Sequence, residues 1–174
     1  ATYASFSGSS LASIRRLSGM DAILVYGPPA TNAVPAIAAS QLRSVPFTFL
    51  VEDVWPDSIF AGGFLEGGQR RRTAEYALTS FMNYVYRKSF AVLATSPGMR
   101  DLLVTRGVQS EKTSLVYNWA DVDTPSRPLR LPPRIPDQPL HIMYSGNFGF
   151  AQDLGNLISA IGQIPEFARL SLLG

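Results

Sequence analysis

Short apolar runs, each followed by a stretch of helical spacing, constrain the fold of this chain more than any other feature. They span residues 22–26, 46–51, 91–95 and 112–117. Strands that carry apolar residues at successive positions are typical of parallel sheets. Since right-handed βαβ crossovers join parallel strands, the pattern predicts an α/β fold with a Rossmann-like, doubly wound parallel sheet.

The intervening segments carry helix signals. Apolar spacing predicts a helix over residues 2–17, and Thr31 or Asn32 is positioned to cap a helix that runs to Leu42. Two more helices are predicted with the N-caps Thr73 and Ser96. The glycines between residues 59 and 72 break every periodic pattern, which predicts a loop there.

Composition bounds the chemistry that is available. The chain has 174 residues, enough for one domain or for parts of two, and its net charge of +2 does not favour nucleic-acid binding. With no cysteine and one histidine, disulfides, thiolate chemistry and a multi-histidine metal site are excluded. No apolar run reaches the roughly 18 residues that a membrane span needs, so we expect any membrane contact to be peripheral.

A proline-rich segment marks a domain boundary. Residues 124–139 contain six prolines and predict an extended connector. We therefore expect a partial domain over residues 1–123, a linker over 124–139 and the start of a second Rossmann-like domain over 140–174. Because a single βαβ unit rarely makes a core unaided, we expect the chain to be part of a longer protein.

The segment after the linker, residues 141–154, has the pattern of a strand, a glycine-bearing turn and a helix start. Such a turn can bind a phosphate through backbone N–H groups of Gly146 and Gly149, or can be a plain strand-to-helix connection. The amides of Asn147 and Gln152 can donate to the same anion, or can simply cap the helix. His141 is interpreted as structural.

Polar residues directly follow the predicted strands, where ligands bind in parallel sheets. Asp53 can orient or deprotonate a hydroxyl of a ligand that stacks on Trp55, or it can accept backbone N–H bonds while Trp55 fills a wall. Asn118 can contact the same ligand, or can be a plain turn residue. Ser96 is interpreted as a helix cap only.

The chain resembles the GT-B glycosyltransferases, and within them the retaining group called family four, which includes bacterial enzymes of surface-polysaccharide assembly. The segment 49–58 resembles that group's RDLWPES signature, with Glu52 where arginine is usual. Three further stretches resemble the group's motifs, and they are residues 95–99, 115–121 and 144–154.

The resemblance implies transfer of a sugar, with retention, from a nucleotide-sugar to an acceptor such as a lipid-linked saccharide. It implies no metal and no cofactor, and a cytoplasmic location with peripheral contact at the inner face of the membrane. The aromatic and basic segment 76–88 can lie against that membrane, or can be a core-packing helix with a basic end. Asp53 is then the candidate catalytic residue. Asn147 and Gln152 take the places of an arginine and a lysine that bind the donor diphosphate in many relatives, and residues 1–174 alone are expected to be inactive.

Two other functions fit the same residues. One is a non-catalytic half that docks the acceptor or a membrane and needs a partner chain for donor binding. The other is a nucleotide-sugar epimerase of the same fold, which would turn over without an acceptor.

Overall fold

The computed structural model describes residues 2–14, 19–61, 67–119, 138–149 and 152–174. It divides into two compact units, the first made of residues 1–60 and 64–119, the second of residues 61–63 and 120–174. Most of the expected linker, residues 124–137, lies outside the described residues.

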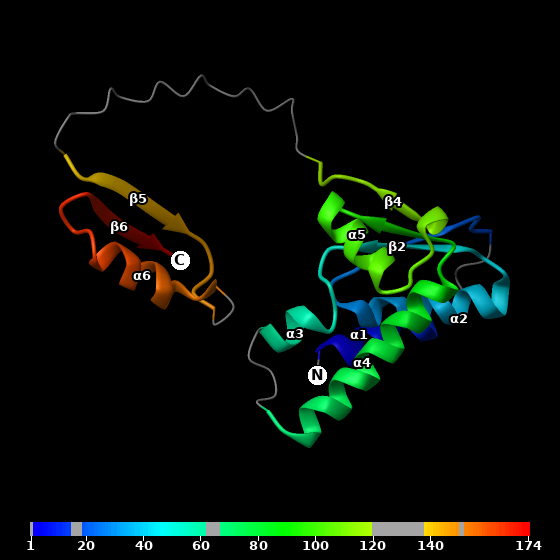
Figure 1. Cartoon of the computed structure of the whole chain (residues 1–174). Coiled ribbons are helices and arrows are strands. Elements are labelled where there is room, and N and C mark those ends of the chain that lie inside the picture. The colour runs from blue at the N-terminus through cyan, green and yellow to red at the C-terminus, as the bar shows by residue number, and fades with distance from the viewer. Residues whose placement is uncertain (1, 15–18, 62–66, 120–137, 150–151) are drawn as a thin grey trace. The chain divides into compact units, whose positions relative to one another are not determined.

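The first unit contains a parallel sheet of four strands in the order β1-β2-β3-β4 (Figure 1). The strands are β1 (Ile23–Tyr26), β2 (Phe47–Val51), β3 (Ala91–Ala94) and β4 (Thr113–Leu115). Each lies within its predicted run. The prediction of an α/β fold with a Rossmann-like parallel sheet is therefore confirmed.

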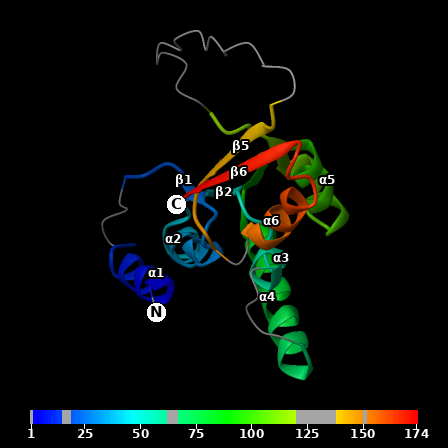
Figure 2. The same ribbon diagram turned by 90° about the vertical axis from the view of Figure 1, so that its left-hand side faces the viewer.

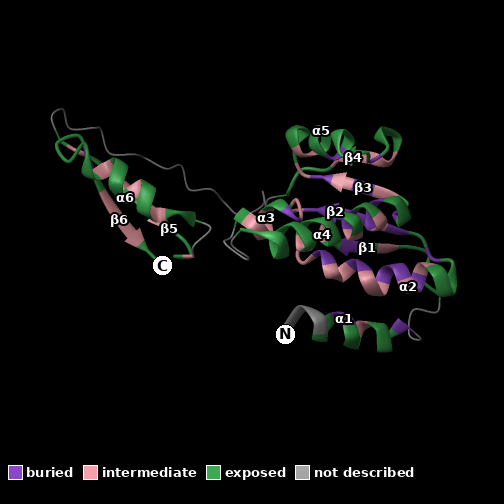
Figure 3. Ribbon diagram, turned by 60° about the horizontal axis from the view of Figure 1, so that its bottom comes forward, coloured by how far each residue is buried: buried purple, intermediate pink, exposed green. Residues whose placement is uncertain are grey.

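Helices connect and flank these strands. They are α1 (Thr2–Ala12), the 3-10 turn η2 (Ala30–Asn32), α2 (Ala33–Arg43), α3 (Asp57–Ala61), α4 (Gln69–Lys88), α5 (Pro97–Thr105) and the 3-10 turn η3 (Ser110–Lys112). Figure 3 shows α1 beyond α2, at the β1 end of the sheet. The buried residues of α4 all lie in its C-terminal half, while its N-terminal half extends away from the sheet (Figure 2).

The core lies between one face of the sheet and helices α2, α4 and α5. Val25, Phe49 and Val92 are paired in register across β1, β2 and β3, so their side chains point to the same face. All three are buried in one cluster with residues of the three helices, among them Met82 and Leu103. Burial of each such side chain contributes about 1.5–3 kcal/mol, which makes this face the main source of stability.

Two predicted caps are wrong. Neither the Thr31 nor the Asn32 side chain caps α2; the Asn32 amide instead donates to the Tyr26 carbonyl at 3.1 Å. Helix α4 begins at Gln69 instead of after Thr73, whose hydroxyl donates to the Gln69 carbonyl inside the helix. Ser96 is the N-cap of α5 as predicted, since its Oγ accepts the Met99 N–H at 3.2 Å.

The predicted loop over residues 59–72 is also wrong at both ends. Helix α3 continues to Ala61, and α4 starts at Gln69. The Arg71 guanidinium lies 5.2 Å from the centroid of the Phe60 ring, a cation–π contact between the two helices. Gly67 and Gly68 precede α4, and residues 62–66 lie outside the described residues, so the loop prediction is wrong only at its two ends.

The second unit is a small βαβ arrangement. Strands β5 (Leu140–Ser145) and β6 (Ala168–Leu173) pair in parallel, and α6 (Leu154–Gly162) lies along one face of them (Figure 1). His141 has a structural contact, because its Nε2 lies 2.8 Å from Ser171 Oγ on the neighbouring strand. Many apolar side chains of this unit stay exposed, including Met143 and Phe167.

Candidate functional site

The carboxyl ends of β2 and β4 are joined by a side-chain hydrogen bond. Asn118 Nδ2 donates to Glu52 Oε2 at 3.2 Å. Because β3 lies between these strands, the pair spans its carboxyl end. Glu52 is half-buried and Asn118 is exposed, so this pair faces the side of the sheet where ligands bind in such folds. Sequence reasoning did not select Glu52 as a site residue, although its position directly after a strand was a usable signal.

Asp53, the candidate catalytic residue, directly follows Glu52 in the chain. Its side chain is exposed, and within the described residues it takes part in no hydrogen bond or ion pair. The structural alternative, in which Asp53 accepts backbone N–H bonds in the turn, is not what the structure shows. The carboxylate is therefore available to a hydroxyl group from solution.

Trp55 is partly buried and packs against the core cluster, and Pro56 after it is buried. Only part of the indole surface is therefore left for a ligand. Its predicted contact with an acceptor stays a prediction.

An ion pair follows this turn. The Arg106 guanidinium, at the C-terminal end of α5, donates two hydrogen bonds to the Asp57 carboxylate at 2.7 and 2.8 Å. The hydrogen bonds from Arg106 hold the pKa of Asp57 below its ordinary value, and Asp57 raises the pKa of Arg106 in turn. The pair links the start of α3 to the end of α5. No sequence pattern predicted this ion pair.

In the second unit, the turn that was predicted to bind phosphate has fewer free donors than expected. The Gly146 N–H donates to the Leu173 carbonyl at 2.9 Å and extends the β5–β6 ladder. This N–H is therefore already bonded in the ladder, and phosphate binding by Gly146 stays a prediction. Asn147 is exposed, and its carbonyl accepts from the Tyr144 hydroxyl at 2.9 Å.

Gly149 and Gln152 lie against each other. Gln152 Oε1 lies 2.5 Å from the position that a Cβ on Gly149 would occupy, so only glycine fits there without a shift of that side chain. Asp153, with a φ of 44°, precedes α6, and its carboxylate accepts from the Asn156 side-chain amide. This carboxylate opposes an anion at the N-terminus of α6. Phosphate binding by Asn147, Gly149 and Gln152 stays a prediction.

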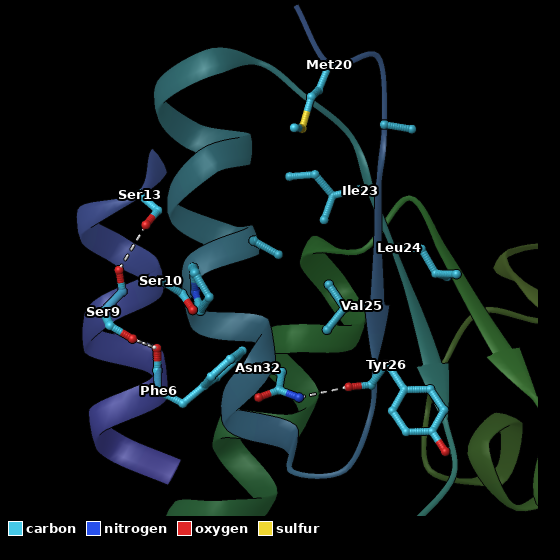
Figure 4. A pocket seen from close by; sticks show the side chains of 13 residues that line it. Phe6, Ser9, Ser10, Ser13, Met20, Ile23, Leu24, Val25, Tyr26 and Asn32 are labelled. Carbon is cyan, nitrogen blue, oxygen red and sulfur yellow. Dashed lines mark hydrogen bonds between the residues drawn. The ribbon is translucent and has the colours of Figure 1, made fainter. Parts of the chain in front are cut away.

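A separate hollow of about 660 Å³ runs along the free edge of β1, between α1 and α2 (Figure 4). Among the described residues, no acidic or basic side chain lines it; Phe6, Met20 and Leu24 are among its walls. At this edge Asn32 Nδ2 donates to the Tyr26 carbonyl, while Asn32 Oδ1 is buried without a partner among the described residues. The described lining is mainly apolar and contains none of the predicted site residues, so we do not take the hollow as the candidate active site.

The described residues contain no group of three or more His, Cys, Asp or Glu side chains that could hold a metal ion. They also contain no helix long and apolar enough to cross a membrane.

Comparison with known proteins places the first unit in a family. Residues 3–119, more than half of the chain, match the model of the glycosyl transferase 4-like domain. The chain belongs to this family. No curated protein sequence matches the chain.

A solved structure shares the fold. The chain is similar to a crystal structure of HepE from Anabaena, described as a complex with UDP and glucose, with a TM-score of 0.61 at 18% sequence identity. The similarity covers 94% of this chain and 42% of that one, so this chain spans less than half the length of its structural relative.

Proposed function

We propose that the protein carrying residues 1–174 transfers a sugar from a nucleotide-sugar to an acceptor hydroxyl. The observation that carries this proposal is the family match over residues 3–119, in a unit whose sheet ends at the free carboxylate of Asp53. The structural relative, described with UDP and glucose, supports a nucleotide-sugar as the donor.

The first unit supplies the acceptor side of the reaction. An acceptor hydroxyl lies against the carboxyl ends of β2 and β4 and donates its hydrogen bond to Asp53. General-base assistance of this kind typically contributes about 10²–10⁴-fold in rate. Trp55 forms the wall beside that hydroxyl, and Asn118 holds the neighbouring Glu52 in place.

The second unit supplies one side of the donor site. Asn147 and Gln152 donate their amides to the donor diphosphate, together with the backbone N–H of Gly149. Donors aimed at the leaving group stabilise the charge that develops on it as the sugar departs. Because Asp153 lies at the same helix end and the Gly146 N–H is already used, this unit binds a nucleotide weakly by itself.

The acceptor is a lipid-linked saccharide of bacterial surface polysaccharide, reached from the cytoplasmic side of the membrane. The exposed half of α4 supports this part of the proposal: it carries Arg70, Arg71 and Arg72 and a Tyr76 side chain that is 77% exposed. Basic and aromatic side chains together favour contact with an anionic membrane surface.

The experiment is a transfer assay on the full-length protein with a panel of nucleotide-sugars and extracted lipid-linked acceptors. Product formation with retained anomeric configuration, determined by NMR, is the expected result. If no donor in the panel is transferred or slowly hydrolysed, the proposed activity is wrong.

A second candidate is a docking half that binds the acceptor or membrane and leaves donor binding to a partner chain. The shortage of free donors in the second unit favours it. UDP titration of the full-length protein separates the two functions, since a docking half would not saturate with nucleotide.

A further inference from the structure

A second hollow lies at the amino end of the first sheet, opposite the end that carries Glu52 and Asn118. It has a volume of about 470 Å³. Its walls come from the last turns of α4, the end of α5 and η3, and they are lined by Asn83, Tyr86, Arg87, Arg106, Gly107, Val108, Gln109 and Lys112. Volumes of this size are typical of sites for small molecules.

The charge of this hollow has one sign. Three of its lining residues are cations and none is acidic. Arg106 is neutralised by its two hydrogen bonds to Asp57, which leaves Arg87 and Lys112 as the unpaired charges. No described carboxylate lies within ion-pair distance of either one.

Lys112 is held in place by two backbone carbonyls. Its ammonium group donates to the carbonyls of Arg87 and Ser89, both at 3.4 Å, at the C-terminal end of α4. Because an ammonium has three N–H donors and both contacts are long, the group retains capacity for a further acceptor. Arg87 is exposed, and its guanidinium lies 5.5 Å from the centroid of the Tyr84 ring, which limits the positions that it can take.

The helix dipole accounts for only part of this charge. A helix C-terminus carries about half a negative charge and attracts one basic side chain in its last turn. Here Arg87 and Lys88 lie in the last turn of α4, and Lys112 of η3 contacts the same helix end. Positive charge is therefore in excess at a concave surface, where an anion is favourable.

Neutral hydrogen-bond donors complete the lining. Asn83 and Gln109 offer side-chain amides. The Tyr86 hydroxyl is buried without a partner among the described residues, and burial raises its pKa to about 12. It therefore stays protonated at neutral pH and can donate a hydrogen bond.

We propose that this hollow binds the phosphate group of an organic phosphate, with Arg87 and Lys112 as the charged donors and Asn83 and Gln109 beside the organic part. A soluble phosphate ester and the headgroup of an anionic phospholipid share this chemistry. The site does not depend on the sugar-transfer proposal, because it lies at the other end of the sheet.

The test uses the 174-residue chain at low ionic strength, with two probes. Glycerol 3-phosphate is titrated calorimetrically, and vesicles of phosphatidylcholine with and without phosphatidylglycerol are used in flotation. The variants are Arg87→Gln and Lys112→Gln, and Arg43→Gln, an exposed position at the end of α2, removes the same charge elsewhere.

We expect each hollow variant to weaken binding about tenfold or more, the scale of a lost charge-assisted hydrogen bond, and Arg43→Gln to change it less than about twofold. Saturable binding of glycerol 3-phosphate identifies a soluble ester. Flotation that needs phosphatidylglycerol, without such saturation, identifies a lipid headgroup.

Two results overturn the proposal. One is that neither probe binds, and the other is that Arg43→Gln weakens binding as much as the hollow variants do. Since Lys112 also holds the end of α4, circular dichroism checks its variant for folding. Arg87 is exposed, so Arg87→Gln keeps the test decisive if the Lys112 variant unfolds.

Discussion

Asn118 donates its side-chain amide to Glu52 at 3.2 Å and so connects the ends of β2 and β4 across β3. The two residues are 66 positions apart in the chain. Asp53 directly follows Glu52, so this edge of the sheet carries two carboxylates with different surroundings. One is oriented by a neighbour and the other is open to a ligand.

We predict that Asn118 acts by positioning Glu52. In the full-length enzyme, Asn118→Leu, which keeps the shape and removes the donor, should raise KM for the acceptor about three- to tenfold and change kcat less, as expected for loss of one hydrogen bond. Steady-state kinetics at fixed donor concentration measure this. Gln163→Leu, an exposed amide at the end of α6, is the control, and an equal effect there would show that Asn118 has no specific role.

Asp53 should be needed for transfer itself. We expect Asp53→Asn to lower kcat by about 10²-fold or more, because the amide cannot accept the proton of the acceptor hydroxyl. Asp21→Asn, an exposed position before β1, removes the same charge and should leave kcat unchanged. A kcat for Asp53→Asn within about threefold of wild type would exclude Asp53 as the base.

The Asp57–Arg106 pair should raise the free energy of unfolding by a small amount that depends on pH. Since the pKa of Asp57 is lowered in the folded state, this contribution is present above its ordinary value of 3.8 and is lost as pH falls below it. The side chains are 56% and 33% exposed, so we expect Asp57→Asn to cost no more than about 1 kcal/mol at pH 7. Urea unfolding at pH 7 and pH 3 tests this, since the difference between variant and wild type should be smaller at pH 3 than at pH 7.

Phe49 should matter more for stability than any exposed aromatic residue. It is 1% exposed and touches Tyr86 in an edge-to-face contact, with the ring centroids 6.1 Å apart. We expect Phe49→Ala to lower the free energy of unfolding by about 3–5 kcal/mol. Phe90, which is 71% exposed, is the matched control, and Phe90→Ala should cost less than about 1 kcal/mol.

The free edge of β1 should promote self-association of the 174-residue chain. Leu24 is 65% exposed on this edge strand, and β1 contains none of the charged or proline residues that normally protect an edge. We expect sedimentation velocity at high protein concentration to show association that Leu24→Lys reduces. Leu42→Lys, at a position 73% exposed on α2, should have little effect; equal effects would point to general solubility instead.

Local signals were reliable where the interaction partner is close in sequence. The Ser96 hydroxyl caps the N–H of Met99 three residues later, and Pro97 begins the helix as its fixed φ favours. Thr73 and Asn32 look similar in the sequence, but their side chains bond elsewhere. Asn32 reaches a carbonyl on β1, which no local pattern contains.

In the candidate site, too, local sequence predicted some features, while others depend on contacts between distant segments. Residue position after a strand was enough to select Asp53 and Asn118, because ligand sites lie at that edge. It did not indicate that Asn118 bonds Glu52, nor that the Gly146 N–H is used by Leu173. Both facts depend on how strands far apart in the chain are placed beside each other.

The sequence alone therefore determined the α/β class, the strands and the Ser96 cap, since these follow from apolar runs and contacts within a few residues. The tertiary structure decided the rest: the Glu52–Asn118 and Asp57–Arg106 pairs, the open carboxylate of Asp53 and the basic hollow at Arg87 and Lys112. These features join segments between 25 and 66 residues apart, and such contacts form only when the strands and helices pack into one core.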